Sequence, residues 1–324
     1  MDTNKKLVLV TGGSGFLGTH TIAELLKNGY PVKTTIRSLN RKEEVLANLR
    51  TAGITDLQKL SFVEADLTAD TNWADAVAGC TYVLHVASPF PAKQPKDENE
   101  LIIPARDGVL RILKAANNGG VKRVVMTSSF AAIGYSTDPK NHVFTESDWT
   151  DENAPIEPYI KSKTIAEKAA WKYIKDSGST MEFSVVNPVG IFGPAVGSAY
   201  SASIDLIVNI MNGTVKENRA FSFGVVDVRD VAEMHLLVME SPIANAERFI
   251  ATADGVMTFF DIASLIKRER SALASDIADL KAGNPADKIT ISNRKAKDML
   301  GWHPRTKEEA ILASVDYLKD QKQN

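Results

Sequence analysis

The chain has 324 residues, 44% of them hydrophobic and 24% charged, so it can bury a large core and intrinsic disorder is excluded. Its 38 basic and 40 acidic residues leave a formal net charge of -2, which excludes a global field that recruits nucleic acid or an anionic membrane surface. The single cysteine, Cys80, excludes an internal disulfide and a cysteine-based metal cluster, and we therefore expect a small molecule as the partner.

The N-terminal segment holds an apolar run, residues 7–10, that ends at a glycine turn. Such a run is too short for the hydrophobic part of a signal sequence or for a membrane span. We therefore expect a cytoplasmic protein with no membrane partner, and the sequence leaves its oligomeric state, monomer or homodimer, open.

Short apolar, β-branched runs then alternate with longer segments whose apolar residues recur at helical spacing. This alternation predicts a doubly wound α/β fold, in which helices cover both faces of a parallel Rossmann sheet. The expected strands cover residues 6–10, 32–36, 60–63, 82–86, 123–126 and 183–186, and the expected helices cover residues 17–27, 43–49, 101–116 and 162–175.

The pattern becomes less regular after Pro188, where a stretch rich in glycine, serine and alanine precedes an amphipathic run over 204–211. We expect a Rossmann domain over 1–188 and a smaller substrate-binding lobe over 189–324. The two are predicted to interleave, because the strand candidates 221–228 and 248–253 are expected to return to the sheet.

A glycine-rich segment, TGGSGFLG at 11–18, lies directly between the first expected strand and the first expected helix. In this context it predicts a dinucleotide-binding turn, because glycines let backbone amides approach a pyrophosphate at a helix N-terminus. The motif can be read with Gly13, Gly15 and Gly18, or with Gly12, Gly15 and Gly18. The intervening Ser14, Phe16 and Leu17 are included in the expected cofactor site.

The end of the second expected strand reads TTIRS, and NAD-binding proteins usually have an acidic residue there. Arg37 occupies that place and Lys42 follows, together with Arg41. A guanidinium binds a phosphate through two hydrogen bonds whereas a carboxylate repels it, so we predict NADPH/NADP+ as the cofactor. Asp66, after the third strand, is expected either to bind the adenine amino group or to cap a helix.

Three polar side chains predict an enzyme. The fifth expected strand ends in TSS at 127–129, and Tyr159 precedes Lys163 by four residues, which places both on one helix face. A lysine cation beside a phenol lowers the pKa of that phenol and makes it a better proton donor. Hydride addition to a carbonyl leaves an alkoxide, which needs a proton and a second hydrogen bond, and Ser129 can donate the latter.

These motifs resemble the extended short-chain dehydrogenases/reductases, in particular the branch of dihydroflavonol, cinnamoyl-CoA and NADPH-dependent methylglyoxal, aldehyde and ketone reductases. The resemblance covers at least residues 5–265 and implies a catalytic triad of Ser129, Tyr159 and Lys163. It also implies that Lys163 contacts the nicotinamide ribose. The segments that carry the resemblance are TGGSGFLG, ADL, HVASP, VVMTSS, YIKSK, EKAAW, NPVGIFGP and VDVRDVA. Within them we expect further cofactor contacts from Leu67, Val86, Ala87, Ser88, Thr127, Pro188 and Val189.

Two departures from the family narrow the substrate. The flavonoid-reducing members have an asparagine five residues after the catalytic serine, where this chain has Gly134, and the cinnamoyl-CoA signature NWYCYGK is absent. A small or flexible apolar aldehyde or ketone is therefore expected, as in the methylglyoxal reductases, in a pocket lined by Phe90, Phe130 and Tyr200. The family's relay asparagine is also missing, and whether nearby Asp107 joins a proton relay is left open.

Two other functions remain as alternatives. A sugar-nucleotide epimerase or dehydratase shares the fold and the triad but retains a tightly bound NAD, and Arg37 argues against it. The second alternative is a regulator that binds NADPH without turnover, and the complete triad argues against this function. We expect no metal, because the five histidines include no pair at metal-ligand spacing on a helix. The physiological substrate and the handedness of the alcohol are not determined by the sequence.

Overall fold

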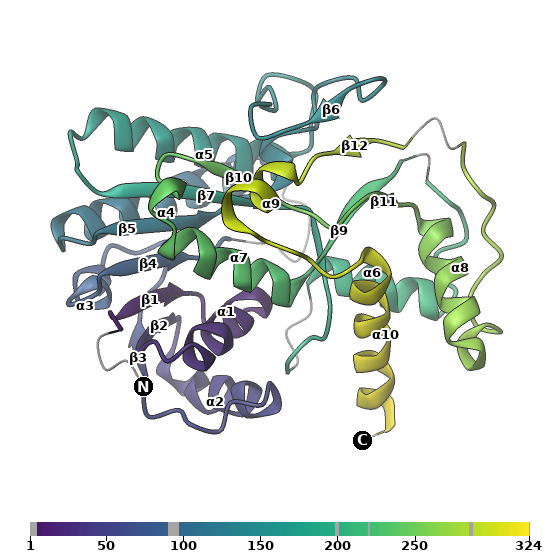
Figure 1. The fold of residues 1–324 in the computed structure, drawn as a ribbon, viewed down its shortest axis with the longest axis horizontal. Helices are drawn as coiled ribbons and strands as arrows, with labels where there is room; N and C mark the ends of the chain where they lie inside the picture. The colour runs from purple at the N-terminus through teal and green to yellow at the C-terminus, as the bar shows by residue number, and fades with distance from the viewer. Residues whose placement is uncertain (1–4, 90–96, 198–200, 220, 285–287, 324) are drawn as a thin grey trace.

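A computed structural model of the chain describes residues 5–89, 97–197, 201–219, 221–284 and 288–323. Its centre is a sheet of seven strands, all parallel (Figure 1). The order across the sheet is β10 (Arg248–Ala251), β7 (Glu182–Pro188), β5 (Arg123–Thr127), β4 (Tyr82–His85), β1 (Val8–Thr11), β2 (Val32–Ile36) and β3 (Leu60–Glu64). The predicted doubly wound α/β fold is confirmed. The strand order reverses beside β1, where such sheets bind nucleotides.

Helices cover both faces of this sheet. On one side lie α1 (Phe16–Lys27), α2 (Lys42–Thr51) and α7 (Val228–Glu240), and on the other α3 (Trp73–Val77), α4 (Asn99–Asn118) and α5 (Pro158–Asp176). Side chains alternate along each strand, so Val8 and Val10 enter the core under α1 and α7 while Leu9 enters the core under α4 and α5. Two buried faces explain why these strands are almost continuously apolar.

The C-terminal part of the chain adds a smaller lobe at the carboxyl edge of the sheet. A three-stranded sheet combines β8 (Gly190–Phe192), β9 (Phe223–Asp227) and β11 (Val256–Met257), and β12 (Thr290–Ile291) pairs with β6 (Val143–Phe144). The helices here are α6 (Ala202–Met211), α8 (Phe259–Glu269), α9 (Arg294–Leu300) and α10 (Lys307–Gln323). Single 3-10 turns cover Leu39–Arg41, Phe130–Ala132, Pro242–Ala244 and Ser271–Leu273.

One expected strand of the sheet is wrong. The run 248–253 returns to the main sheet as β10, but the run 221–228 forms β9, which pairs with β8 and β11 instead. Its residues from Gly224 to Asp227 are buried in the lobe. An apolar run predicts a buried strand but does not specify which sheet buries it.

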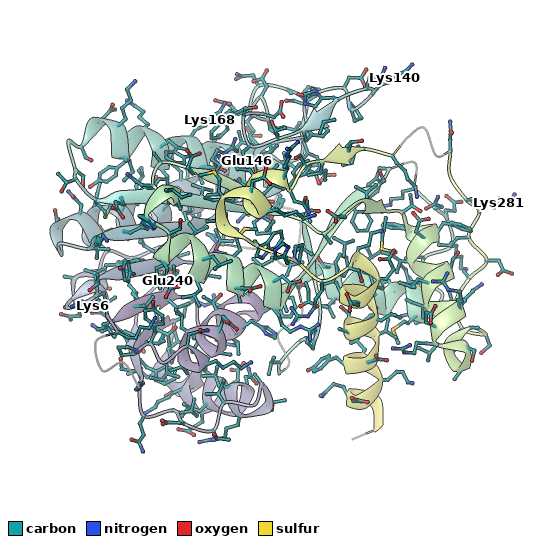
Figure 2. The ribbon with its side chains drawn as sticks, viewed as in Figure 1. Lys6, Lys140, Glu146, Lys168, Glu240 and Lys281 are labelled. Carbon is teal, nitrogen blue, oxygen red and sulfur yellow. The ribbon has the colours of Figure 1, made fainter. Side chains whose placement is uncertain are left out.

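The lobe and the sheet share one hydrophobic core. Phe192, Ile204 and Ile311 of the lobe belong to the same cluster of buried residues as Leu17 and Val231 beneath the sheet. The domain boundary at residue 188 therefore stays a prediction. Charged side chains such as those of Lys6, Lys140 and Lys281 project outward from the ribbon (Figure 2). Among the described helices, none combines the length and the apolar character that crossing a bilayer requires.

Candidate active site

The glycine-rich segment forms a compact turn between β1 and α1. Gly12 has a φ of +75°, a left-handed backbone conformation that glycine adopts more readily than other residues. Its carbonyl oxygen accepts a hydrogen bond from the Gly15 amide at 3.0 Å. A side chain at position 18 would overlap that same carbonyl oxygen. Helix α1 starts at Phe16, so its first amides lie at the carboxyl edge of the sheet, where they can bind a pyrophosphate.

Strand β2 holds this turn in place. The hydroxyl of Thr35 accepts a hydrogen bond from the Gly12 amide at 3.1 Å, and the Thr35 carbonyl accepts one from the Gly13 amide at 3.1 Å. These bonds fix the amides of the turn, and its glycines leave the space that a phosphate needs.

The basic residues after β2 differ in their surroundings. Arg37 is exposed, at the end of the strand. Arg41 donates from Nη1 to the Ser14 hydroxyl at 3.0 Å and pairs with Glu44 at 2.8 Å. Lys42 instead lies with Nζ 5.7 Å from the ring centroid of Phe62. Of the two cations after Arg37, the structure thus brings Arg41 to the glycine turn and directs Lys42 to another contact.

Asp66 lies in a turn after β3. Its Oδ1 accepts hydrogen bonds from the amide and the hydroxyl of Thr68 at 2.8 and 2.7 Å, and these bonds lower the pKa of the carboxyl, with a smaller contribution from Arg37. The expectation that Asp66 caps a helix is wrong, because the next helix, α3, begins after Asn72. The adenine contact stays a prediction.

The segment VDVRDVA at 226–232 holds two aspartates that could cap the N-terminus of α7. Asp227 occupies that position, with its side chain accepting a hydrogen bond from the Arg229 amide at 2.9 Å. Asp230 lies inside α7 and pairs with Arg305. Both aspartates are therefore structural in this arrangement.

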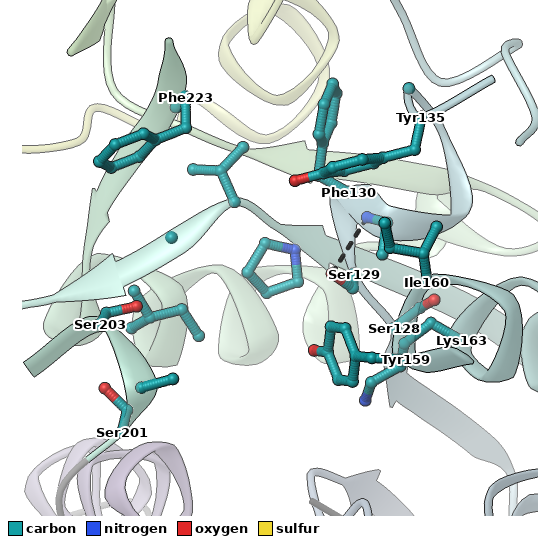
Figure 3. A pocket seen from close by; sticks show the side chains of 18 of the residues that line it. Ser128, Ser129, Phe130, Tyr135, Tyr159, Ile160, Lys163, Ser201, Ser203 and Phe223 are labelled. Atoms are coloured by element: carbon teal, nitrogen blue, oxygen red, sulfur yellow. Dashed lines mark hydrogen bonds between the residues drawn. The ribbon is translucent and has the colours of Figure 1, made fainter. Parts of the chain in front are cut away.

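Ser129, Tyr159 and Lys163 meet on one wall of a pocket of about 890 Å3 (Figure 3). The wall is built from the end of β5 and the start of α5, whose first helical residue, Pro158, suits a helix N-terminus. The side chain of Ser129 hydrogen-bonds that of Tyr159, and its Oγ also accepts a bond from the Ala131 amide at 3.1 Å. The Nζ of Lys163 lies 5.7 Å from the Tyr159 ring centroid.

Burial changes the acid–base properties of this pair. It raises the pKa of Tyr159 to about 12, although the hydrogen bond from Ser129 lowers that pKa in part. Burial likewise lowers the pKa of Lys163 to about 8, against the charge of Glu167, which raises it. The pKa of Tyr159 thus lies above its usual value, contrary to the lowering expected from the sequence, because burial outweighs the favourable contacts. At neutral pH Tyr159 is neutral and Lys163 is mostly a cation beside it. The Lys163 ammonium donates to the Ser88 hydroxyl at 2.7 Å.

The two adjacent serines after β5 have different partners. Ser128 is buried and its hydroxyl donates to the Glu167 carboxylate at 2.5 Å, whereas the Ser129 hydroxyl contacts Tyr159. This difference favours Ser129 as the residue that binds a substrate oxygen, because the Ser129 hydroxyl lies beside the phenol of Tyr159 whereas the Ser128 hydroxyl is buried against Glu167.

A buried histidine orients Thr127, the last residue of β5. His235 lies 2.7 Å from the Val231 carbonyl through Nδ1 and 2.7 Å from the Thr127 hydroxyl through Nε2. Burial lowers the pKa of His235 to about 4, so the ring is neutral. Since a carbonyl only accepts, Nδ1 carries the proton and Thr127 donates to Nε2.

The remaining residues expected from the sequence divide into three groups. Seven line the main pocket: Phe16, Leu17, Val86, Thr127, Phe130, Pro188 and Val189. Three line a small cavity that shares Thr127 and Lys163 with it: Leu67, Ala87 and Ser88. Phe90 and Tyr200 lie outside the described residues. Asp107, considered for a relay, pairs with its neighbour Arg106 at 2.7 Å.

Several pocket residues were not found from the sequence. Tyr135, Glu157, Ile160 and Phe223 also line the pocket. Burial raises the pKa of the Tyr135 phenol, and Glu157 raises it further, so the two side chains lie in one electrostatic environment. Ile160 lies inside the recognised segment YIKSK and Glu157 just before it, so their closeness to Tyr159 in sequence could have indicated both. Only the fold brings Tyr135 and Phe223 to the triad. Among the described residues, no group of three or more histidine, cysteine or acidic side chains is arranged to hold a metal ion.

Comparison with known proteins agrees with this geometry. The family model described as "NAD dependent epimerase/dehydratase family" matches residues 8–250. A cinnamoyl-CoA reductase of Medicago truncatula is 32% identical over 98% of this chain and 96% of its own, and an anthocyanidin reductase of Vitis vinifera is 30% identical over 97% and 96%. The crystal structure of yeast methylglyoxal/isovaleraldehyde reductase Gre2 complexed with NADPH superimposes with a TM-score of 0.85, at 28% identity, over 98% of this chain and 100% of that chain. The chain therefore belongs to the NAD dependent epimerase/dehydratase family, in agreement with its resemblance to the extended short-chain dehydrogenases/reductases.

Proposed function

We propose that this protein is an NADPH-dependent carbonyl reductase, a ketoreductase and aldehyde reductase that converts small aldehydes or ketones to alcohols. The observation that carries this proposal is the meeting of Ser129, Tyr159 and Lys163 on one wall of a largely apolar pocket next to the glycine turn. Bound NADPH supplies the hydride. The residues of this chain supply the proton, the hydrogen bonds and the exclusion of water that the reaction also needs.

Each member of the triad has one role in this proposal. Ser129 donates a hydrogen bond to the substrate's carbonyl oxygen, which becomes negative as the carbonyl carbon is reduced. Tyr159 gives its phenolic proton to that oxygen, so that an alcohol is formed. Lys163 stabilises the phenolate that remains, and it does so because its ammonium is held beside the ring by the pocket and by Ser88. Water then restores the proton to Tyr159.

The proposed cofactor fits the cradle. The amides around Gly12 and Gly15 and the start of α1 would hold the pyrophosphate, and Arg37 with Arg41 would bind the 2′-phosphate. Lys163 would bind the nicotinamide ribose, as the family resemblance implies. The yeast reductase with a similar fold was solved with NADPH, which supports the same cofactor here.

The shape of the pocket supports a small or flexible apolar substrate. A Cβ atom at Gly134 would lie 2.5 Å from the Phe130 ring, so an asparagine cannot occupy that position unless Phe130 moves. The polar contact that flavonoid-reducing relatives have at this place is therefore absent. Phe130, Ile160 and Phe223 present apolar surface to the substrate instead.

The proposal is tested by following NADPH and NADH oxidation with methylglyoxal, diketones, ketoesters and aromatic aldehydes. We expect carbonyl-dependent oxidation of NADPH in preference to NADH. NAD that stays bound through purification would point to the epimerase or dehydratase alternative, and binding of NADPH without turnover on any carbonyl would point to a regulator. Cell fractionation tests the cytoplasmic location, which also stays a prediction.

A further inference from the structure

A carboxylate lies fully buried behind the proposed triad. Glu167 is four residues after Lys163 on α5 and has no exposed surface. Its two oxygens accept four hydrogen bonds, which is the number of donors that satisfies an ionised carboxylate. The donors are Ser128 Oγ at 2.5 Å, Arg248 Nε at 2.7 Å, Asn187 Nδ2 at 2.8 Å and Trp171 Nε1 at 3.2 Å.

Part of this arrangement is an ordinary buried ion pair. Arg248 neutralises Glu167, lies 3.8 Å from the ring centroid of Trp149, and donates to the carbonyls of Glu146 and Asp148. Burying a charge is costly unless it is paired and hydrogen-bonded, and apolar residues of the same size are often at least as stable. Stability alone therefore does not explain why two of the four donors come from the strand ends at the active site.

Those two donors fix the backbone around Ser129. Ser128 is bound through its hydroxyl, and Asn187 at the end of β7 donates a second hydrogen bond from the same Nδ2 to the Ser129 carbonyl at 3.2 Å. One carboxylate thus holds the residue before Ser129 directly and the Ser129 peptide through Asn187. The direction of the Ser129 hydroxyl depends on this backbone.

The charge of Glu167 also acts on Lys163. Burial lowers the pKa of Lys163 and Glu167 raises it. Among the described residues, Glu167 is the one charge that shifts the pKa of Lys163. His85 on β4 is buried with a pKa lowered to about 3, and Tyr159 is neutral. On α4, Arg106 and Asp107 pair with each other, and Glu98, directly before α4, pairs with Lys161 on α5. Arg248 on β10 is bound to Glu167.

We propose that Glu167 is a positioning residue of this active site, which fixes the Ser129 backbone through Ser128 and Asn187 and keeps Lys163 protonated. The inference rests on the proposed reductase function. It adds a residue that touches neither substrate nor cofactor but sets the geometry of one triad member and the charge of another.

The test is the pH dependence of kcat/KM in the variant Glu167→Gln, which keeps the shape of the side chain and removes its charge. Reduction requires protonated Lys163, so activity falls as pH rises through the pKa of Lys163. Without the carboxylate that pKa falls, and the basic limb of the profile should move to lower pH by about 0.5 to 1 unit. A second expected effect is a fall in kcat of roughly tenfold, with the Kd for NADPH unchanged.

Two control variants separate these effects. Asp176→Asn removes one acidic charge from the exposed end of the same helix and should leave both kcat and the profile unchanged. Ser128→Ala removes one of the hydrogen bonds but not the charge, so kcat should fall a few-fold while the basic limb stays in place. An unchanged basic limb in folded Glu167→Gln would overturn the charge role.

If Glu167→Gln does not fold, the double variant Ser128→Ala/Asn187→Ala carries the test, because it leaves the pair of Glu167 and Arg248 intact. A loss of kcat of about tenfold with unchanged NADPH affinity is expected, and a kcat within twofold of the parent would overturn the inference. If the parent protein turns over no carbonyl, the proposed function itself is wrong. If the parent is active and the variants behave like it, only the role of Glu167 is wrong.

Discussion

Cofactor selection is the property in which single side chains have the most direct effect. Arg37 is exposed at the end of β2, and Arg41 reaches Ser14 in the glycine turn while pairing with Glu44. We predict that Arg37→Asp and Arg41→Ala each reduce the preference for NADPH over NADH, and that Lys42→Ala does not, because Lys42 lies over Phe62. The two arginines and the lysine differ by only a few positions but contact different parts of the structure.

The magnitude follows from the exposure of the two arginines. A hydrogen bond to a charged group contributes about 1.5 to 3 kcal/mol, and the lower value applies to partly exposed side chains. About 1.4 kcal/mol corresponds to a factor of ten. Arg41→Ala should therefore lower the preference for NADPH over NADH by roughly tenfold or less, because the ion pair with Glu44 already offsets part of the Arg41 charge. Arg37→Asp adds repulsion of the phosphate and should lower it by roughly 10²-fold.

The assay is the ratio of kcat/KM for NADPH to kcat/KM for NADH, measured at one saturating carbonyl concentration. Lys42→Ala is the matched control, since it removes one cation from the same segment. We expect kcat at saturating NADPH to change little in all three variants. A parent enzyme that prefers NADH, or an Arg37→Asp variant that keeps the parent's ratio, would refute the assignment. An effect of Lys42→Ala equal to that of Arg41→Ala would refute the distinction between them.

Three further predictions concern the site and its stability. Ser129→Ala should lower kcat by roughly 10² to 10³-fold and Ser128→Ala only a few-fold, and the reverse order would transfer the role to Ser128. Gly18→Ala places a methyl group against the Gly12 carbonyl, so a fluorescence titration should show at least tenfold weaker NADPH binding, and unchanged affinity would contradict the tight turn. Three buried histidines have pKa values lowered by burial to about 3 or 4, below the unfolded value of 6.5, so the unfolded chain takes up protons first and the free energy of unfolding should fall as pH decreases from 7.5 to 5.5. Each histidine can contribute up to about 1.3 kcal/mol to this fall, and carboxyls whose pKa is raised in the folded state oppose it. The free energy of unfolding is measured by urea titration at the two pH values, and an unchanged value would contradict the prediction. The histidines are His20, His85 and His235.

The fold was predictable because its signals are local. The strand at 32–36 was predicted with its observed ends, and the helix expected over 162–175 lies inside α5, which begins four residues earlier at Pro158 and ends at Asp176. The convergence of Ser129 with Tyr159 and Lys163 followed from parallel topology, which brings the carboxyl ends of strands to one edge. Their chemical roles are proposals that mutagenesis must test.

What the sequence did not predict depends on contacts between distant residues. β9 was assigned to the wrong sheet, since the partner of a buried strand is chosen by packing. The contact of Arg41 with Ser14 depends on the 3-10 turn over Leu39–Arg41, which decides the direction of each side chain. Glu167 accepts hydrogen bonds from the residue after β5, from β7 and from β10, and no local pattern indicates that these three segments meet at one carboxylate.

The central claim is that Tyr159 gives the proton in an NADPH-dependent reduction of a carbonyl group. The most direct measurement compares the parent with Tyr159→Phe, which removes only the hydroxyl, in carbonyl-dependent NADPH oxidation and in NADPH binding. We predict that kcat falls by at least 10²-fold, the scale of general acid catalysis, while the Kd for NADPH stays within about twofold. Activity of Tyr159→Phe within a few-fold of the parent would contradict the account.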